Sequence, residues 1–273
     1  MDIERHNHRE IELLNQRGGR TLTVVDLIRA DTLSVPMAAY ALRAIEQGAS
    51  LLTGARPGGA GKTTLMASIL HLLPPGVRIV TIDGPQLLRD GPATTVALDR
   101  NAPSPPAPLP ERERGEPQCY LVHEIGDGHW YGYLWGPAVA RYLALIDGRR
   151  RIASCLHADT LEELTEILSS PPLCVARETL ARVGLILFMH VDRSRAGYRR
   201  RVATLHEADS SGGHRLVFAW DPVSDTFRPT AALREPEALA RYAQFIQQMI
   251  DQGESDATSV RRKVLAFYGR AVR

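Results

Sequence analysis

The chain has 273 residues, with 33 basic and 31 acidic side chains and a formal net charge of +2. Hydrophobic residues make up 44% and charged residues 23%, as in soluble globular proteins with a core of their own, and the small net charge makes no strong case for a nucleic-acid-binding protein. Three cysteines without metal-ligand spacing, and no apolar run of about 18 residues, predict a cytoplasmic protein with reduced thiols.

The first 48 residues are predicted to form a short N-terminal segment. A charged helix is expected within residues 1–20, followed by a turn at the glycine pair 18–19. After a short apolar run, Ser34 is expected to cap a helix over residues 37–47, which Gly48 ends.

Residues 49–83 have the pattern of a βαβ unit. A short apolar strand over residues 49–53 leads into a glycine-rich turn, and an apolar helix over residues 65–73 follows. A second strand over residues 78–83 ends on Asp83. This order of strand, loop, helix and strand is typical of a parallel sheet.

A proline-rich stretch at residues 91–118 interrupts the pattern. Its seven prolines and charged run predict a solvated, largely disordered insertion. The pattern resumes with a strand that ends on Glu124, a helix over residues 136–147, and a strand over residues 151–156 that leads to His157.

The rest of the chain is predicted to add helices and an antiparallel hairpin. Thr160 and Glu163 fit a capping box at the start of a helix. The later elements are a helix near 173–182, strands near 183–189, 199–207 and 215–220, and helices at 235–250 and 259–270. The sequence therefore predicts an α/β fold with three parts, namely an N-terminal segment (1–48), a core (49–230) and a helical tail (231–273).

The glycine-rich turn predicts a P-loop that binds ATP. Glycines let backbone N–H groups approach phosphate oxygens, and the next helix directs its N-terminus at them. Lys62, one of only two lysines, would reach the β- and γ-phosphates, and the Thr63 hydroxyl would bind Mg²⁺. The predicted nucleotide-binding residues are Gly58, Gly59, Ala60, Gly61, Lys62, Thr63 and Thr64.

The loop departs from the usual P-loop pattern at its first position. Arg56 stands where a glycine is usual, and Gly54 lies two residues earlier, which predicts a loop about two residues longer than normal. The alternatives are a flexible glycine turn without a ligand, or a cradle that the Arg56 guanidinium plugs.

Three further residues are candidates for the reaction. Glu124 and Asp83 end predicted strands, where a carboxylate could hold Mg²⁺ or polarise water. The predicted metal ligands are Thr63 and Glu124. His157 could contact the γ-phosphate. Each could instead be an ordinary strand-end side chain. The arginine clusters at 149–151 and 199–201 are more typical of solvated surfaces than of an arginine finger, an acidic-partner surface or a nucleic-acid motor.

Together these pieces resemble the type II/IV secretion system ATPases, in particular their Tad-pilus and type IV conjugation branch. The similar stretches are residues 18–28, 61–66, 78–83, 121–124, 155–163 and 200–209. The resemblance implies a RecA-like P-loop fold. It also implies that Lys62 and Thr63 are the Walker A pair, Asp83 the water-activating acid, Glu124 the Walker B glutamate and His157 the histidine-box residue.

The family resemblance implies an ATPase that powers secretion or pilus assembly. Such a protein would be a homo-oligomer, a hexamer, that acts on a membrane-bound assembly protein and lies at the inner face of the membrane through that partner. The chain departs from the family at His123 before Glu124, at the residues after Asp83, in the proline-rich insertion and in its short N-terminal segment. These departures leave a degenerate, non-hydrolysing regulatory or adaptor module as the alternative.

Overall fold

The computed structural model describes six stretches of the chain. They cover residues 2–15, 18–83, 87–88, 116–128, 132–194 and 197–271. The predicted disordered insertion lies outside the described residues as far as residue 115, and the described chain is already in a strand at Gln118.

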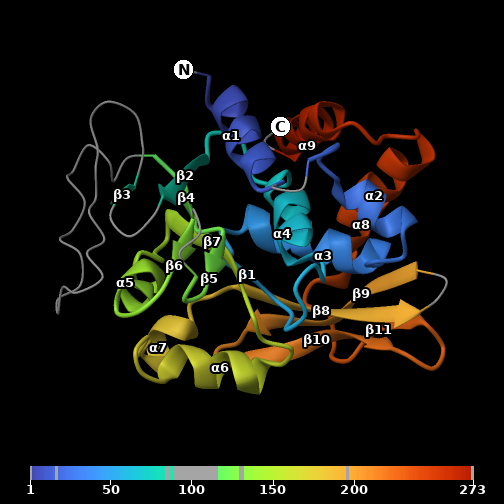
Figure 1. Ribbon diagram of the computed structural model, residues 1–273. Helices are drawn as coiled ribbons and strands as arrows, with labels where there is room; N and C mark the ends of the chain where they lie inside the picture. Colours follow the sequence, from blue (N-terminus) through green and yellow to red (C-terminus); the bar gives the residue numbers. More distant parts are fainter. Residues whose placement is uncertain are drawn as a thin grey trace.

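A sheet with five parallel strands forms the centre of the described molecule (Figure 1). These strands lie in the order β8-β1-β7-β4-β2. Their bounds are Leu51–Gly54 (β1), Arg78–Asp83 (β2), Gln118–Leu121 (β4), Arg150–Leu156 (β7) and Leu185–Ser194 (β8). The predicted α/β fold with a mostly parallel sheet is confirmed. The strand that precedes Glu124 is separated from the strand that precedes the glycine-rich loop by β7.

Antiparallel strands extend the sheet beyond β8. The predicted hairpin is confirmed as β9 (Gly197–Ala208) and β10 (His214–Asp221), and β11 (Thr226–Pro229) pairs with β10. Strand β8 is longer than predicted, because it pairs along its whole length with β9. Strand β3 (Leu87–Leu88) pairs with β2 at the other edge, whereas β5 (Glu124–Ile125) pairs with the end of β7 and with β6 (Tyr133–Leu134).

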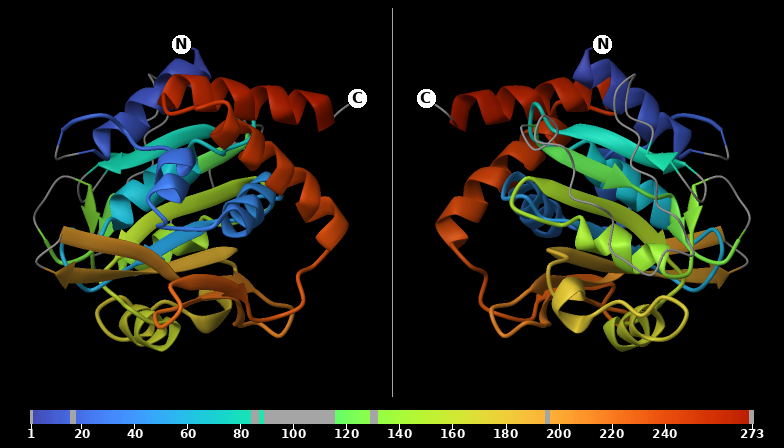
Figure 2. Two further views of the ribbon diagram at one scale, coloured as in Figure 1. Left: turned by 90° about the vertical axis from the view of Figure 1, so that its right-hand side faces the viewer. Right: turned by 90° about the vertical axis from the view of Figure 1, so that its left-hand side faces the viewer.

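Helices cover both faces of the sheet (Figure 2). Alternate strand residues point to opposite faces, so Leu51 of β1 joins one buried cluster and Leu52 joins the other. The first cluster includes residues of α1 (Ile3–Leu13), α2 (Val24–Arg29), α3 (Val35–Glu46), α4 (Lys62–Leu70), α8 (Pro236–Asp251) and α9 (Ala257–Ala271). The second includes residues of α5 (Ala138–Ala144), α6 (Leu161–Ser169) and α7 (Arg177–Leu180).

The N-terminal and C-terminal helices lie side by side on the first face (Figure 1). Arg261 of α9 pairs with Glu4 of α1, with 2.7 Å between Nε and Oε2. Tyr242 of α8 donates a hydrogen bond to Glu46 at the end of α3. The two predicted C-terminal helices are confirmed as α8 and α9, and they pack against the N-terminal segment. None of the described helices combines the length and apolar content that a membrane span requires.

One predicted helix cap is confirmed, one differs from the prediction, and one predicted helix begins later than expected. Ser34 caps α3, as predicted. Thr160 accepts the Glu163 N–H, but the Glu163 carboxylate accepts the Asp159 N–H (2.9 Å) and does not close the predicted capping box. The predicted helix over residues 173–182 is wrong in its first part, because Cys174 has a φ of 49° and helix α7 begins only at Arg177.

Gly54 ends β1 at a point where no side chain fits. A Cβ there would lie 2.6 Å from both the Ala158 carbonyl oxygen and Cδ1 of Phe188. We expect Gly54→Ala to lower the free energy of unfolding by about 1–3 kcal/mol through overpacking, as measured by urea denaturation. Gly148→Ala is the control, because a Cβ there meets no described atom within 4 Å. Equal effects of the two substitutions would contradict the close packing around Gly54.

His71, at the end of α4, is buried without a hydrogen-bond partner for either ring nitrogen among the described residues. Burial lowers the pKa of His71 to about 4, and the positive charges of His8 and Arg261 act in the same direction. The unfolded chain, with an ordinary pKa of 6.5 at this side chain, therefore binds the proton more readily between these values. Stability should fall as pH drops below 6.5, by about 2 kcal/mol at pH 5.

Urea denaturation at pH 7 and pH 5 tests this expectation. His71→Leu should remove that share of the pH dependence. Burial also lowers the pKa of His206 to about 4, so His206 contributes the same pH dependence of stability to the wild type and to the variant. An unchanged loss of stability in the variant would show that His71 is not the titrating group.

Candidate functional site

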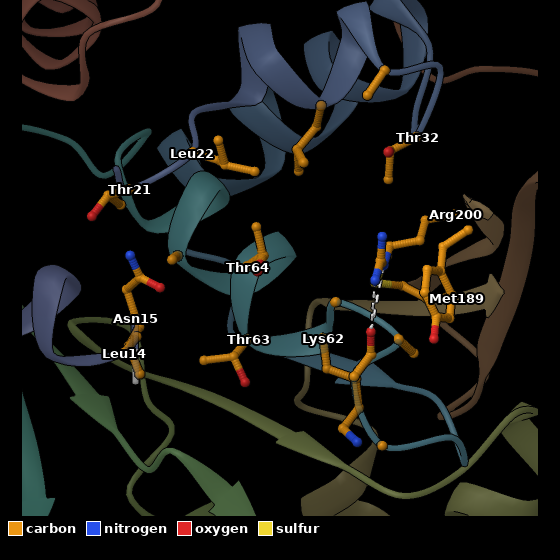
Figure 3. Close-up of a pocket in the computed structure, with 18 of the residues that line it drawn as sticks. Leu14, Asn15, Thr21, Leu22, Thr32, Lys62, Thr63, Thr64, Met189 and Arg200 are labelled. Atoms are coloured by element: carbon orange, nitrogen blue, oxygen red, sulfur yellow. Dashed lines mark hydrogen bonds between the residues drawn. The ribbon is translucent and has the colours of Figure 1, made fainter. Parts of the chain in front are cut away.

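A cavity of about 850 Å³ lies where the segments that follow β1, β4 and β7 meet (Figure 3). The carboxyl ends of parallel strands share one edge of a sheet, which is where ligands collect in open α/β folds. The cavity is lined by all seven predicted nucleotide-binding residues and by two of the predicted catalytic residues, namely Gly58, Gly59, Ala60, Gly61, Lys62, Thr63, Thr64, Glu124 and His157.

The glycine-rich loop begins directly after Gly54, which is the last residue of β1. The loop proper therefore spans residues 55–61, and the close packing around Gly54 accounts for a glycine at that position. Gly59 and Gly61 have φ values of 78° and 103°, in the left-handed region that glycine adopts at little cost. Glycine suits position 61 for a second reason, since a Cβ there would lie 3.1 Å from Cε of Met189.

Arg56 does not plug the loop. Its Nε lies 2.5 Å from Oε1 of Glu163, on the N-terminal part of α6, and its backbone N–H donates to Asp159 (2.7 Å). Hydrogen bonds from the Asp159 N–H and from Arg56 lower the pKa of Glu163, so the carboxylate stays charged. The unusual arginine therefore anchors the start of the loop and leaves the cradle open.

Helix α4 begins at the cavity without a side-chain cap. Gly61 is its N-cap residue, and no side chain bonds to the first N–H groups of the helix. The first backbone bond of the helix runs from the Leu65 N–H to the Gly61 carbonyl (2.8 Å). The earlier N–H groups, at Lys62, Thr63 and Thr64, have no partner within the helix, and the helix dipole adds positive potential there. Such an end is suited to bind an anion.

Buried Lys62 and Glu124 form a polar cluster with the half-exposed His157 beside this helix end. The Lys62 ammonium donates to the Ala55 carbonyl (3.2 Å) and lies 3.3 Å from Nδ1 of His157 and 3.9 Å from Oε2 of Glu124. Nε2 of His157 lies 2.8 Å from the other Glu124 oxygen, and its Nδ1 lies 2.7 Å from the Arg56 carbonyl oxygen. The loop, Glu124 and His157 are thus linked by direct contacts.

A layer of polar groups supports this cluster. Cys155 donates its S–H to the His123 carbonyl (2.7 Å) and lies 3.7 Å from the Thr63 hydroxyl. Burial, with a smaller effect of the Glu124 charge, raises the pKa of Cys155 to about 12, so the thiol keeps its proton. Burial and the same carboxylate raise the pKa of Tyr133 to about 12. Tyr133 carried no signal in the sequence, because only the β5–β6 pairing brings it to the cavity.

The structure describes the side chain of Glu124 but not that of Asp83, the other predicted acid. Glu124 does not end β4 as predicted. That strand stops at Leu121, and Glu124 begins β5, which pairs with the end of β7 and so brings the carboxylate beside His157. Asp83 ends β2, opposite Leu87 of β3. Its side chain lies outside the described residues, so its role stays a prediction.

Two residues of the cavity wall could hold a magnesium ion together with ligands from outside the protein. Among the described residues, no group of three or more His, Cys, Asp or Glu could hold a metal ion. Thr63 and Glu124 nevertheless place two oxygen donors in the cavity wall, and Mg²⁺ commonly binds through one or two protein oxygens together with phosphates and water.

The arginine clusters are less solvated than predicted. Arg151 is buried and donates to the Ile45 carbonyl near the end of α3 (2.6 Å), a structural role. Arg199, Arg200 and Arg201 line the cavity. Sequence reasoning missed this placement, because it depends on how β9 pairs with β8.

Comparison with known proteins gives a distant structural likeness. No protein-family model matches the chain, and no curated protein matches it. Among solved structures, the chain is similar to the ATPase DotB of Legionella pneumophila, with a TM-score of 0.40 and 14% identity over 82% of this chain. The chain spans 62% of that protein's length. At this level of similarity, the match assigns neither an activity nor a site residue to the chain.

Proposed function

We propose that the chain binds Mg²⁺-ATP in this cavity and hydrolyses it. One observation carries the proposal, namely an uncapped helix N-terminus that opens into the cavity beside a buried lysine and carboxylate. The helix end and Lys62 supply positive potential for phosphates. Glu124 supplies a carboxylate of the kind that positions an attacking water.

The remainder of the cavity is suited to a nucleoside. It is lined by apolar side chains and hydrogen-bonding groups from the segment that joins α1 to α2, including Leu14, Asn15, Thr21 and Leu22. A volume of about 850 Å³ lies within the range of small-molecule sites. The phosphates would then lie at the loop and the base toward the N-terminal segment.

Hydrolysis would use the polar cluster as follows. Water attacks the γ-phosphorus, the bond to the ADP oxygen breaks, and Glu124 accepts a proton from the water. His157, 2.8 Å from Glu124, would hold the carboxylate in position, and Lys62 would neutralise charge on the transferred phosphoryl group. Mg²⁺, when bound, would supply further charge neutralisation at the phosphates.

A second candidate function is a nucleotide-binding module without turnover. The observation that favours it is the engagement of Glu124 by both His157 and Lys62, which leaves fewer lone pairs for a water molecule. Phosphate release by the purified full chain with ATP and Mg²⁺ separates the two. Release above that of a heat-denatured sample supports the ATPase. Saturable ATP binding without release supports the module, and a chain that does not bind ATP contradicts both.

The proposal for the cellular role rests on the resemblance of the sequence to the type II/IV secretion system ATPases. We propose that the chain is an ATPase of the type II/IV secretion type, that it forms a homo-oligomer, a hexamer, and that it powers a membrane-bound secretion or pilus assembly from the cytoplasmic side. The mass of the protein in solution, measured with and without ATP, tests the assembly. A monomer under both conditions would contradict it.

A further inference from the structure

Three consecutive arginines on β9 line the cavity, and they differ in what neutralises them. Arg199 pairs with Asp192 (2.6 Å), and Arg201 pairs with Asp225 (2.8 Å). No carboxylate among the described residues pairs with Arg200. An arginine without an acidic partner on a cavity wall is suited to bind an anionic ligand.

The Arg200 guanidinium reaches the glycine-rich loop itself. Its Nε and Nη2 lie 3.4 and 3.2 Å from the Gly59 carbonyl oxygen, to which both donate. Its Cδ would lie 3.4 Å from a Cβ on Gly61. A guanidinium carries about five N–H donors, so the contact with Gly59 orients the group and leaves donors for a ligand.

The backbone around Arg200 is held in place by the chain itself. The Val202 N–H donates to the Thr32 carbonyl (2.7 Å), and Arg201 donates to the Ala30 carbonyl (3.3 Å). The Tyr198 ring centroid lies 5.2 Å from the guanidinium carbon. These contacts tie the start of β9 to the connection between α2 and α3, so no second subunit is needed to place Arg200.

Arg200 and the Lys62 amine lie at different sides of the site. In Figure 3 the Lys62 side chain and the Thr63 hydroxyl point downward from the first turn of α4. The Arg200 guanidinium lies above Lys62, at the height of Thr64 and toward Thr32. The lysine of a P-loop reaches the β- and γ-phosphates. The part of the nucleotide nearest Arg200 would therefore be the α-phosphate, toward the nucleoside.

We propose that Arg200 binds the α-phosphate of the nucleotide from within the same chain, an inference that rests on the proposed function. A guanidinium forms charge-assisted hydrogen bonds to a phosphate through paired N–H donors, which an ammonium cannot reproduce. The contact is made to a phosphate that ADP and ATP share. Arg200 therefore strengthens the binding of both nucleotides alike and does not distinguish them.

Equilibrium titration of the full chain with ADP and with ATP tests the proposal. Arg200→Ala should weaken the binding of both nucleotides by about tenfold to a hundredfold, and Arg200→Lys should recover only part of the loss. Arg228→Ala is the matched control for loss of a positive charge, since Arg228 is an exposed side chain on β11 that pairs with Asp221 (3.3 Å). It should bind as the wild type does.

A second measurement separates direct contact from mere support of the loop. An ADP analogue with sulfur in place of a non-bridging oxygen of the α-phosphate should bind the wild type more weakly than ADP does. That penalty should shrink in Arg200→Ala, while the penalty of sulfur at the β-phosphate stays the same. Wild-type affinity in Arg200→Ala, or an α-sulfur penalty equal in both proteins, would overturn the proposal. A wild-type chain that binds no ADP would overturn the proposed function as well.

Discussion

Replacing Lys62 by alanine should weaken ATP binding by about a hundredfold or more. Lys62 is 5% exposed and lies at the N-terminus of α4. Charge-assisted bonds from a buried ammonium to phosphate are among the strong interactions of a binding site. Without the ammonium, the negative charge of Glu124 would no longer be offset by Lys62, and it would repel the phosphates more strongly. Equilibrium titration with ATP and Mg²⁺ measures the effect.

The second lysine provides a matched control. Lys263 lies on α9, where it pairs with Glu254 (2.9 Å), away from the cavity lining. Lys263→Ala removes the same charge from the chain and should bind ATP as the wild type does. If both variants bind ATP equally well, the P-loop assignment is wrong.

Replacing Glu124 by glutamine should reduce ATP hydrolysis by about a hundredfold or more, with little loss of ATP binding. The substitution keeps the shape of the side chain and removes its ability to accept a proton, and general-base catalysis typically contributes a factor of about 10²–10⁴. Loss of the negative charge near Lys62 (3.9 Å) would, if anything, strengthen phosphate binding. Phosphate release and ATP titration, measured on the same preparation, separate the two effects.

Comparison with His157 refines this prediction. His157→Ala leaves the carboxylate in place and removes its 2.8 Å contact, so turnover should fall less than in Glu124→Gln. Equal phosphate release from wild type and Glu124→Gln would show that Glu124 is not the base. If both proteins release phosphate only at the rate of a heat-denatured sample, the non-hydrolysing module becomes the better account.

The glycine-rich loop and the helix that follows it could be predicted from the sequence because their signals are local. Gly59 and Gly61 adopt backbone angles that favour glycine, and Lys62 and Thr63 follow directly at the start of a helix. The convergence of this loop with His157 was also predictable, since both follow buried parallel strands. Both features follow from local sequence patterns and from the rule that parallel strands end at the same edge of a sheet.

The rest of the site depends on pairings between distant segments. The sequence does not reveal that β7 lies between β1 and β4, which places His157 between Lys62 and Glu124. Nor does it show that β8 and β9 pair along ten residues of β8, which carries Arg200 to the loop. The sequence could not decide whether Arg56 plugs the loop for the same reason, because its partner Glu163 is 107 positions away.

The most direct test of the account is a crystal structure of the full chain with Mg²⁺ and a non-hydrolysable ATP analogue. The β- and γ-phosphates should lie within hydrogen-bonding distance, about 3 Å, of the N–H groups of Gly61, Lys62 and Thr63 and of the Lys62 ammonium. A nucleotide bound elsewhere, with the end of α4 free of phosphate, would contradict the central claim that this helix end and its lysine hold the triphosphate.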